Sequence, residues 1–197
     1  MFESILPLVL FALISTFSPG GATTLATASG ANFGLRRSLP LLAGISFGLA
    51  SVAAAAAGGL AGLILAAPSL QLAMKLVGSI YLLWLAWQIA RRGAPGVAGT
   101  QEKPASFLTG VWLLGQNPKA WAMTLSAAAS FAALAQSPAA LALLLGLVFA
   151  LCSALSLMIW CVAGLMLART LKTQRQWHML NKALGGLLVA SVVPIWF

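Results

Sequence analysis

The stretch "STFSPGGATT", residues 15–24, interrupts an apolar segment near the N-terminus. Proline removes a backbone donor and clashes with the preceding helical turn, and glycine disfavours helix. The surrounding residues 4–30 are otherwise long enough to cross a bilayer, which takes about 20 apolar residues. Backbone groups freed within hydrocarbon must be satisfied by protein or by a water-filled cavity. The stretch therefore predicts a broken transmembrane helix whose break faces the interior of the protein.

The composition is that of an integral membrane protein. Of the 197 residues, 61% are hydrophobic and 7% are charged, and the mean hydropathy is +0.99, whereas soluble domains carry about 25% charged residues. The net charge of +9 does not indicate nucleic-acid binding, because the cations lie in short gaps between apolar segments. The N-terminal sequence "MFESILPLVLFALIST" lacks the basic region of a signal peptide, so we expect the first segment to be retained.

Six apolar segments are predicted to cross the membrane within a single domain, residues 1–197. They span about 4–30, 39–66, 70–90, 106–131, 139–168 and 177–197. Nine of the eleven cations follow the first, third and fifth segments: Arg36, Arg37, Arg91, Arg92, Lys103, Arg169, Lys172, Arg175 and Lys182. Because positively charged loops remain in the cytoplasm, we expect both termini outside and the central loop, 91–105, inside.

A second break lies in the fourth segment. The stretch "GQNPKAWAMT", residues 115–124, places Pro118 at 99 residues after Pro19. The chain then divides into halves of about 1–93 and 104–197 with three segments each, and an odd number of crossings gives the halves opposite orientations. The predicted fold is all-α, with two inverted three-helix repeats and broken first and fourth helices. Paired breaks of this kind indicate the binding site of a transporter.

The residues at the two breaks suit an anionic group on a ligand. The N-terminus of a half-helix presents free N–H groups and the positive end of the helix dipole, which favour a carboxylate. Glycine lets the backbone approach a ligand closely, threonine and asparagine add hydrogen bonds, and lysine offsets an anion's charge. The predicted substrate-binding residues are Pro19, Gly20, Gly21, Thr23, Thr24, Asn117, Pro118 and Lys119.

The ionisable and sulfur-containing side chains narrow the function further. The predicted segments contain no Asp or Glu in their interiors, which argues against a cationic substrate such as a divalent metal. Cys152 and Cys161, nine residues apart, point to opposite sides of a helix and are expected to be buried small hydrophobes. His178 is expected to be solvated, and Lys75 to extend its ammonium to the outer interface. We expect no cofactor, no metal site and no enzymatic activity.

Glycine and aromatic residues of the first half have structural interpretations. Gly44 with Gly48, and Gly58 with Gly62, form GxxxG pairs that let helices pack closely. The sequence leaves open whether they pack within the domain or form a homodimer contact. Tyr81, Trp84 and Trp87 precede the arginines at the end of the third segment, where an interfacial aromatic belt is expected rather than a ligand-stacking site.

The chain resembles the LysE/RhtB family of amino-acid exporters in "SPGGATTLATASGANFGLRRSLPLLAGISFG" (18–48), "LVGSIYLLWLAWQIAR" (76–91) and "GQNPKAWAMTLSAAASF" (115–131). That family has a proline-glycine motif in its first segment and a glycine-spaced second segment. Its third segment ends in a "GxxYLxxLxxxxxR" pattern, and "NPKAW" opens the fourth. The first motif usually reads Pro-Gly-Pro in the family, whereas Gly21 holds the third place here.

The resemblance implies export of amino acids or close derivatives across the bacterial inner membrane, driven by the proton motive force. It gives functional weight to Pro19, Gly20, Asn117, Pro118 and Lys119, and it makes a small neutral amino acid the expected substrate. Two alternatives stay open at this level. One is a membrane scaffold or accessory subunit without transport, and the other is an exporter of a different solute class, such as metal ions.

Overall fold

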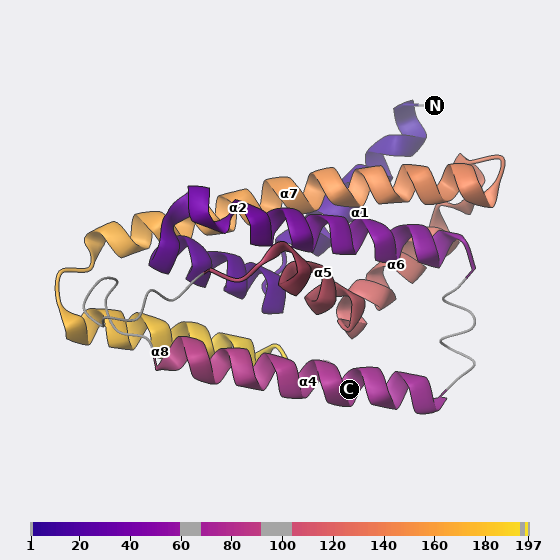
Figure 1. Cartoon of the computed structure of the whole chain (residues 1–197). Coiled ribbons are helices and arrows are strands. Elements are labelled where there is room, and N and C mark those ends of the chain that lie inside the picture. The colour runs from indigo at the N-terminus through magenta and orange to yellow at the C-terminus, as the bar shows by residue number, and fades with distance from the viewer. Residues whose placement is uncertain (1, 60–67, 92–103, 194–195, 197) are drawn as a thin grey trace.

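The computed structural model describes residues 2–59, 68–91, 104–193 and 196 (Figure 1). These residues form seven α-helices and one short 3-10 turn without any strand, which confirms the all-α class for this part of the chain. The helices are α1 (Phe2–Phe17), α2 (Gly21–Ala57), α4 (Pro68–Ala90), α5 (Phe107–Gly115), α6 (Pro118–Ser130), α7 (Pro138–Thr170) and α8 (Gln174–Ala190). The end of the second predicted segment, with Gly62, and most of the central loop lie outside the described residues.

Both predicted helix breaks are present. Helix α1 ends at Phe17 and α2 begins at Gly21, while α5 ends at Gly115 and α6 begins at Pro118. At the second break, Pro118 occupies the first turn of α6, where a missing N–H removes no helical hydrogen bond. Proline therefore starts a new helix here after ending the previous one.

Gly34 separates the first two segments, and the expected connection over residues 31–38 is wrong. The backbone of Gly34 has φ 76° and ψ 171°, a conformation that residues with a side chain rarely adopt. The hydroxyl oxygens of Ser29 and Ser38 are 2.7 Å apart, although nine residues of straight helix span about 13 Å. The chain therefore folds back at one glycine, and helical conformation resumes by residue 35 rather than 39.

The last helix also differs from its predicted span of 177–197. Thr173 and Gln176 form a reciprocal capping box that starts α8 at Gln174. The helix ends at Ala190, a few residues before Pro194, because a proline disfavours helical conformation in the residue before it. The predicted segment was therefore placed too late at its start and too late at its end.

Glycines bring helix backbones into direct contact. A Cβ on Gly30 of α2 would overlap the carbonyl of Cys161 on α7, and one on Gly164 of α7 would overlap the carbonyl of Thr27. Gly44 of α2 approaches the carbonyl of Phe107 at the start of α5 in the same way. Helix α2 thus packs on both α7 and α5, and Gly44 is used for packing within the chain.

The helix ends gather at two opposite ends of the molecule (Figure 1). The fold-back in α2, the end of α4, the start of α5 and the α7–α8 connection lie at one end. The end of α2, the start of α4 and the connection from α6 to α7 lie at the other. Arg36, Arg37, Arg91, Arg169 and Lys172 belong to the elements of the first end, which we call the basic end.

The described surface suits a membrane. By length and composition, α2 and α7 are the described helices that could each cross a bilayer, and the apolar helical stretches Ile5–Phe17 and Lys75–Ala90 are shorter. Large apolar side chains such as Ile14, Phe47, Ile80 and Leu151 are exposed, and apolar exposure on this scale marks contact with lipid or another apolar partner.

The close approach of α2 to α7 predicts that Gly30→Ala destabilises the protein. Forcing a methyl group into a packed helix contact costs about 1–3 kcal/mol, so we expect a lower melting temperature in detergent. Gly186→Ala on α8 is the matched control, because a Cβ there meets nothing within 4 Å and alanine favours helix. Equal melting temperatures for the two variants would contradict the contact.

Candidate functional site

The two helix breaks meet in space, although 101 residues separate the side chains that join them. The Lys119 ammonium, in the first turn of α6, donates to the Ser18 Oγ at 2.6 Å and to the Ser18 carbonyl at 3.2 Å. The same ammonium lies about 3.5 Å from where a Cβ on Gly20 would stand. The second break therefore places its cation directly on the backbone of the first.

The first break leaves carbonyls at the end of α1 that lack helical partners, and neighbouring side chains satisfy them. The Thr16 carbonyl accepts from Ser156 Oγ at 2.9 Å, and the Phe17 carbonyl accepts from the Trp160 indole at 3.3 Å, both on α7. The Ser18 carbonyl accepts from Lys119. This is the internal pairing that a broken helix requires where water is absent.

The amides that start α2 are less fully paired. The Gly20 N–H donates to Thr23 Oγ1 at 2.9 Å, and that hydroxyl donates back to the Gly20 carbonyl. Gly20 carries no side chain that could cap the following N–H groups, and α2 begins without a side-chain cap. The positive end of this helix is thus presented beside the Lys119 ammonium.

The second break is ordered by asparagine and tryptophan. Asn117 Oδ1 accepts from the Lys119 N–H at 3.0 Å and so caps α6. The Trp121 indole donates to the Gly115 carbonyl, the last of α5, at 2.8 Å. The cap uses one lone pair of the Asn117 oxygen and holds the side chain in place beside the cavity.

A small cavity of about 40 Å³, here called the break cavity, lies where the two breaks meet. A water molecule takes about 30 Å³ of liquid, so the cavity in this conformation is too small for an organic ligand. Lys119 is the one ionisable side chain among its described lining residues. These are Ser15, Thr16, Ser18, Gly20, Gly21, Ala22, Thr23, Ile45, Leu49, Leu114, Asn117, Lys119, Ala120, Met123, Ser153 and Leu157.

The predicted site residues divide into two groups. The structure brings Gly20, Gly21, Thr23, Asn117 and Lys119 together around the break cavity. Three others do not line it: Pro19, Thr24 and Pro118. Thr24 is buried, Pro19 is exposed and Pro118 is half-buried. Pro19 and Pro118 shape the breaks, and contact of Pro19, Thr24 or Pro118 with a substrate stays a prediction.

Lys119 is exposed over a large part of its side chain, which differs from the expectation of a lysine deep in its segment. The ammonium reaches the cavity by extending along Gly20 to Ser18. The aliphatic part of the side chain can then lie in apolar surroundings while the charged end reaches polar partners.

Helix α4 closes one side of both breaks and brings in a residue that the sequence did not single out. A Cβ on Gly78 would lie 3.0 Å from the Gln116 carbonyl, and Leu82 lies against Gly21. Gln116 is buried, and neither polar atom of its side-chain amide has a hydrogen-bond partner within the described structure. In the sequence, the signal that could have identified Gln116 was its position directly before Asn117 in the second motif.

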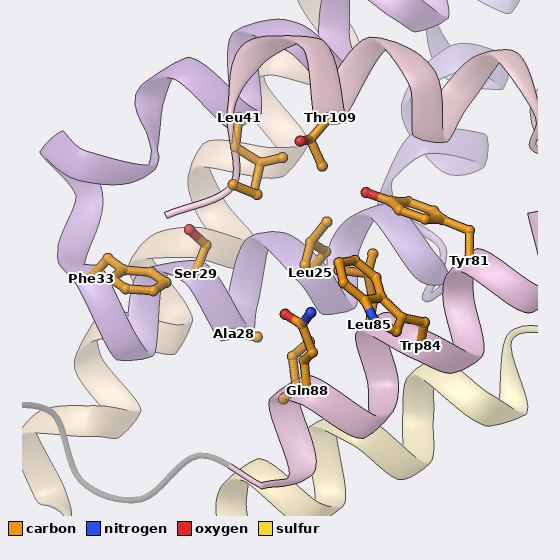
Figure 2. A pocket seen from close by; sticks show the side chains of 12 residues that line it. Leu25, Ala28, Ser29, Phe33, Leu41, Tyr81, Trp84, Leu85, Gln88 and Thr109 are labelled. Atoms are coloured by element: carbon orange, nitrogen blue, oxygen red, sulfur yellow. The ribbon is translucent and has the colours of Figure 1, made fainter. Parts of the chain in front are cut away.

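Other side chains that the sequence analysis singled out lie outside the break cavity. Cys152 and Cys161 are buried and unpaired, and His178 is exposed near the start of α8. Within the described residues, no group of three or more His, Cys, Asp or Glu side chains could hold a metal ion. Trp87 is exposed, with the Arg91 guanidinium 4.2 Å above its ring. Tyr81 and Trp84 also line a second, larger cavity (Figure 2). Trp84 is about as exposed as Trp87, so the interfacial belt stays a prediction for these residues.

Comparisons with known proteins identify the family of the chain. The model of the LysE type translocator family matches residues 13–192. A cysteine/O-acetylserine efflux protein of Klebsiella pneumoniae is 31% identical over 94% of this chain and 93% of its own length. Proteins of the same name from Salmonella typhimurium and Escherichia coli K12 are each 28% identical over 95% of this chain and 94% of their own. No solved structure matches significantly. The chain therefore belongs to the LysE type translocator family, and it is a membrane transporter rather than an enzyme.

Proposed function

We propose that this protein exports small amino acids or their close derivatives from the bacterial cytoplasm across the inner membrane. The observation that carries the proposal is the meeting of the two helix breaks, with Lys119 held on Ser18 beside the uncapped start of α2. A cation, a helix N-terminus and hydroxyl groups around one cavity form a site for a carboxylate. The relatives named cysteine/O-acetylserine efflux proteins support a small, neutral amino acid as the cargo.

Lys119 exchanges partners during transport in this proposal. Without substrate, its ammonium is neutralised in part by the Ser18 carbonyl and hydroxyl, at the negative end of the α1 dipole. A substrate carboxylate carries a full negative charge. Its oxygens therefore accept stronger hydrogen bonds from the Lys119 ammonium than the neutral oxygens of Ser18 do. Because the break cavity measures about 40 Å³, substrate entry requires the helices around it to move apart.

The proposed architecture is six crossings in two inverted halves, 1–93 and 104–197, each with a broken first helix. The helix contacts support it: the first segment packs on α7 of the second half, and α5 of the second half packs on α2. The third helices of the two halves, α4 and α8, pack on each other. When the two halves are exchanged, the contact of α1 with α7 corresponds to that of α5 with α2, and the contact of α4 with α8 corresponds to itself. This symmetry suits alternating access around the breaks. The proton motive force drives export.

We expect the Lys119→Met variant to lose export, because methionine keeps a long apolar side chain and removes the ammonium. A hydrogen bond to a charged group is worth about 1.5–3 kcal/mol, so we expect export to fall about tenfold or more. Lys119→Arg, which keeps the charge, should retain part of the rate. Lys75→Met on α4 is the control, since Lys75 does not line the break cavity. Export by Lys119→Met at the wild-type rate would refute the carboxylate site.

Export itself is measured in a bacterial host that lacks its own cysteine/O-acetylserine exporter. Cells expressing this protein are loaded with labelled amino acids, and we expect faster release of at least one small neutral amino acid or O-acetylserine. A protonophore should abolish the difference between expressing and empty cells. If no amino acid leaves faster, while Ser18→Ala or Asn117→Ala alters only protein assembly, the protein is a scaffold and the transport proposal fails.

The membrane topology predicts opposite outcomes for two reporter fusions. A reporter that is active only outside the cytoplasm should be active when fused after Ser137, between α6 and α7. The same reporter should be inactive after Lys172, between α7 and α8, because cation-rich loops stay inside. A cytoplasmic Ser137 fusion would contradict the six crossings. Reporter activity is scaled to the amount of each fusion in membranes, so that poor expression is not taken for a cytoplasmic location.

A further inference from the structure

A cavity of about 360 Å³ lies between α2, α4 and the start of α5 (Figure 2). We call it the inner cavity. It is several times larger than the break cavity and has the size range of small-molecule sites, about 300–1,000 Å³. Its lining residues are Leu25, Ala28, Ser29, Phe33, Leu41, Tyr81, Trp84, Leu85, Gln88, Ile89, Ala105 and Thr109.

Helices α2 and α5 line both the inner cavity and the break cavity, with different residues in each. In the first part of α2, Thr23 lines the break cavity and Leu25 the inner one. After the fold-back at Gly34, Leu41 lines the inner cavity, and Ile45, one turn later, lines the break cavity. One helical turn rises about 5.4 Å, so residues of α2 that are close in sequence line different cavities.

The inner cavity lies on the side of the basic end. Ser29 and Phe33 approach the fold-back at Gly34, and Gln88 and Ile89 lie in the last turn of α4 before Arg91. On α5, Thr109 near the start of the helix lines the inner cavity, whereas Leu114 near its end lines the break cavity. Since the basic end is cytoplasmic in the proposed topology, a solute that leaves the cytoplasm reaches the inner cavity first.

Several of the polar and aromatic side chains that line this cavity come from one face of α4. Tyr81, Trp84, Leu85, Gln88 and Ile89 follow the three- and four-residue spacing of a single helix face. The Tyr81 hydroxyl and the Gln88 amide point into the cavity, and the hydroxyl of Thr109 on α5 lies at its edge (Figure 2). The Ser29 hydroxyl on α2 is already hydrogen-bonded to Ser38. The aromatic rings of Tyr81 and Trp84 lie together, with centroids 5.8 Å apart.

These groups match a zwitterion with no net charge. Hydroxyl and amide donors suit a carboxylate, and the amide oxygen with the aromatic faces suits an ammonium. None of the described lining residues is Asp, Glu, Lys, Arg or His. A solute with a charged side chain would therefore enter without a counter-charge, which is costly away from bulk water.

We propose that the inner cavity is a second substrate site, which receives amino acids with uncharged side chains from the cytoplasm before they reach the break cavity. The proposal rests on the proposed export function and deepens it. The inner cavity selects by net charge and shape, and the break cavity then holds the carboxylate next to Lys119. Selection on the cytoplasmic side precedes the opening of the breaks, so rejected amino acids do not start a transport cycle.

The test uses thiol labelling of the full-length protein in inside-out membrane vesicles. Gln88→Cys and Thr109→Cys each place a thiol in the inner cavity, and a membrane-impermeant thiol reagent is added to the cytoplasmic face. The native chain provides a low background, because Cys152 and Cys161 are buried. We expect both variants to react, and we expect O-acetylserine, L-serine or L-leucine to slow the reaction several-fold. L-Lysine and L-glutamate at the same concentration should not slow it.

Two further variants separate specific occupancy from general effects. Lys172→Cys lies in the exposed α7–α8 connection at the basic end, outside the cavity, and should react without protection by any amino acid. Gln88→Glu adds one negative charge with almost no change in shape, so L-lysine should now inhibit export, whereas Gln88→Met should not acquire this inhibition. Each variant is compared at matched amounts in the membrane. If Gln88→Cys does not accumulate, Thr109→Cys reports on the same cavity.

The outcomes distinguish this proposal from the export function. If wild-type protein exports amino acids but none of the three neutral probes slows labelling of Gln88→Cys or Thr109→Cys, the second site is refuted while the export function stands. Equal protection by L-lysine would refute the selection by charge. If the wild-type protein exports no amino acid at all, the export function itself fails.

Discussion

The structure depends on finding partners for the backbone groups that the two helix breaks set free. A helix interrupted in the membrane exposes carbonyls that water cannot reach. At the first break, Ser156 and Trp160 of α7 take up the carbonyls of Thr16 and Phe17, and Lys119 takes up that of Ser18. At the second break, the Trp121 indole takes up the Gly115 carbonyl. At each break, a tryptophan N–H thus donates to one of the freed carbonyls. The Ser18 carbonyl of the first break is paired by Lys119 of the second break.

These hydrogen bonds require helices that lie unusually close together. Gly30 and Gly164 bring the backbones of α2 and α7 into contact, and Gly44 does the same for α2 and α5. With larger residues at these positions, the helices would move apart and the side chains of α7 would no longer reach the end of α1. Close packing by small residues is therefore what makes the breaks tolerable, and the breaks in turn create a cavity that Lys119 lines.

The fold-back at Gly34 gives α2 a double role. Its two parts run alongside each other, braced by the hydrogen-bonded hydroxyls of Ser29 and Ser38, and both line the inner cavity and the break cavity. A movement at this glycine would change both cavities together, because the same helix forms a wall of each. The inner cavity faces the basic end and carries no charge on its described walls, whereas the break cavity carries Lys119. A neutral zwitterion would therefore meet uncharged polar groups before it meets a cation.

The sequence by itself determined the features that depend on local chemistry. Pro19 and Pro118 each end the helix before them, because proline lacks the N–H that a continuing helix needs. The positions of the cations along the sequence indicate which ends of the segments lie together. Tertiary structure decided which groups meet across long separations. Nothing in the local sequence indicates that Lys119 binds Ser18, that α4 packs on the Gln116 backbone, or that Tyr81 lines a cavity. The reason is physical: these contacts depend on how closely the helices pack, and that distance is set by glycines on helices far apart in the sequence.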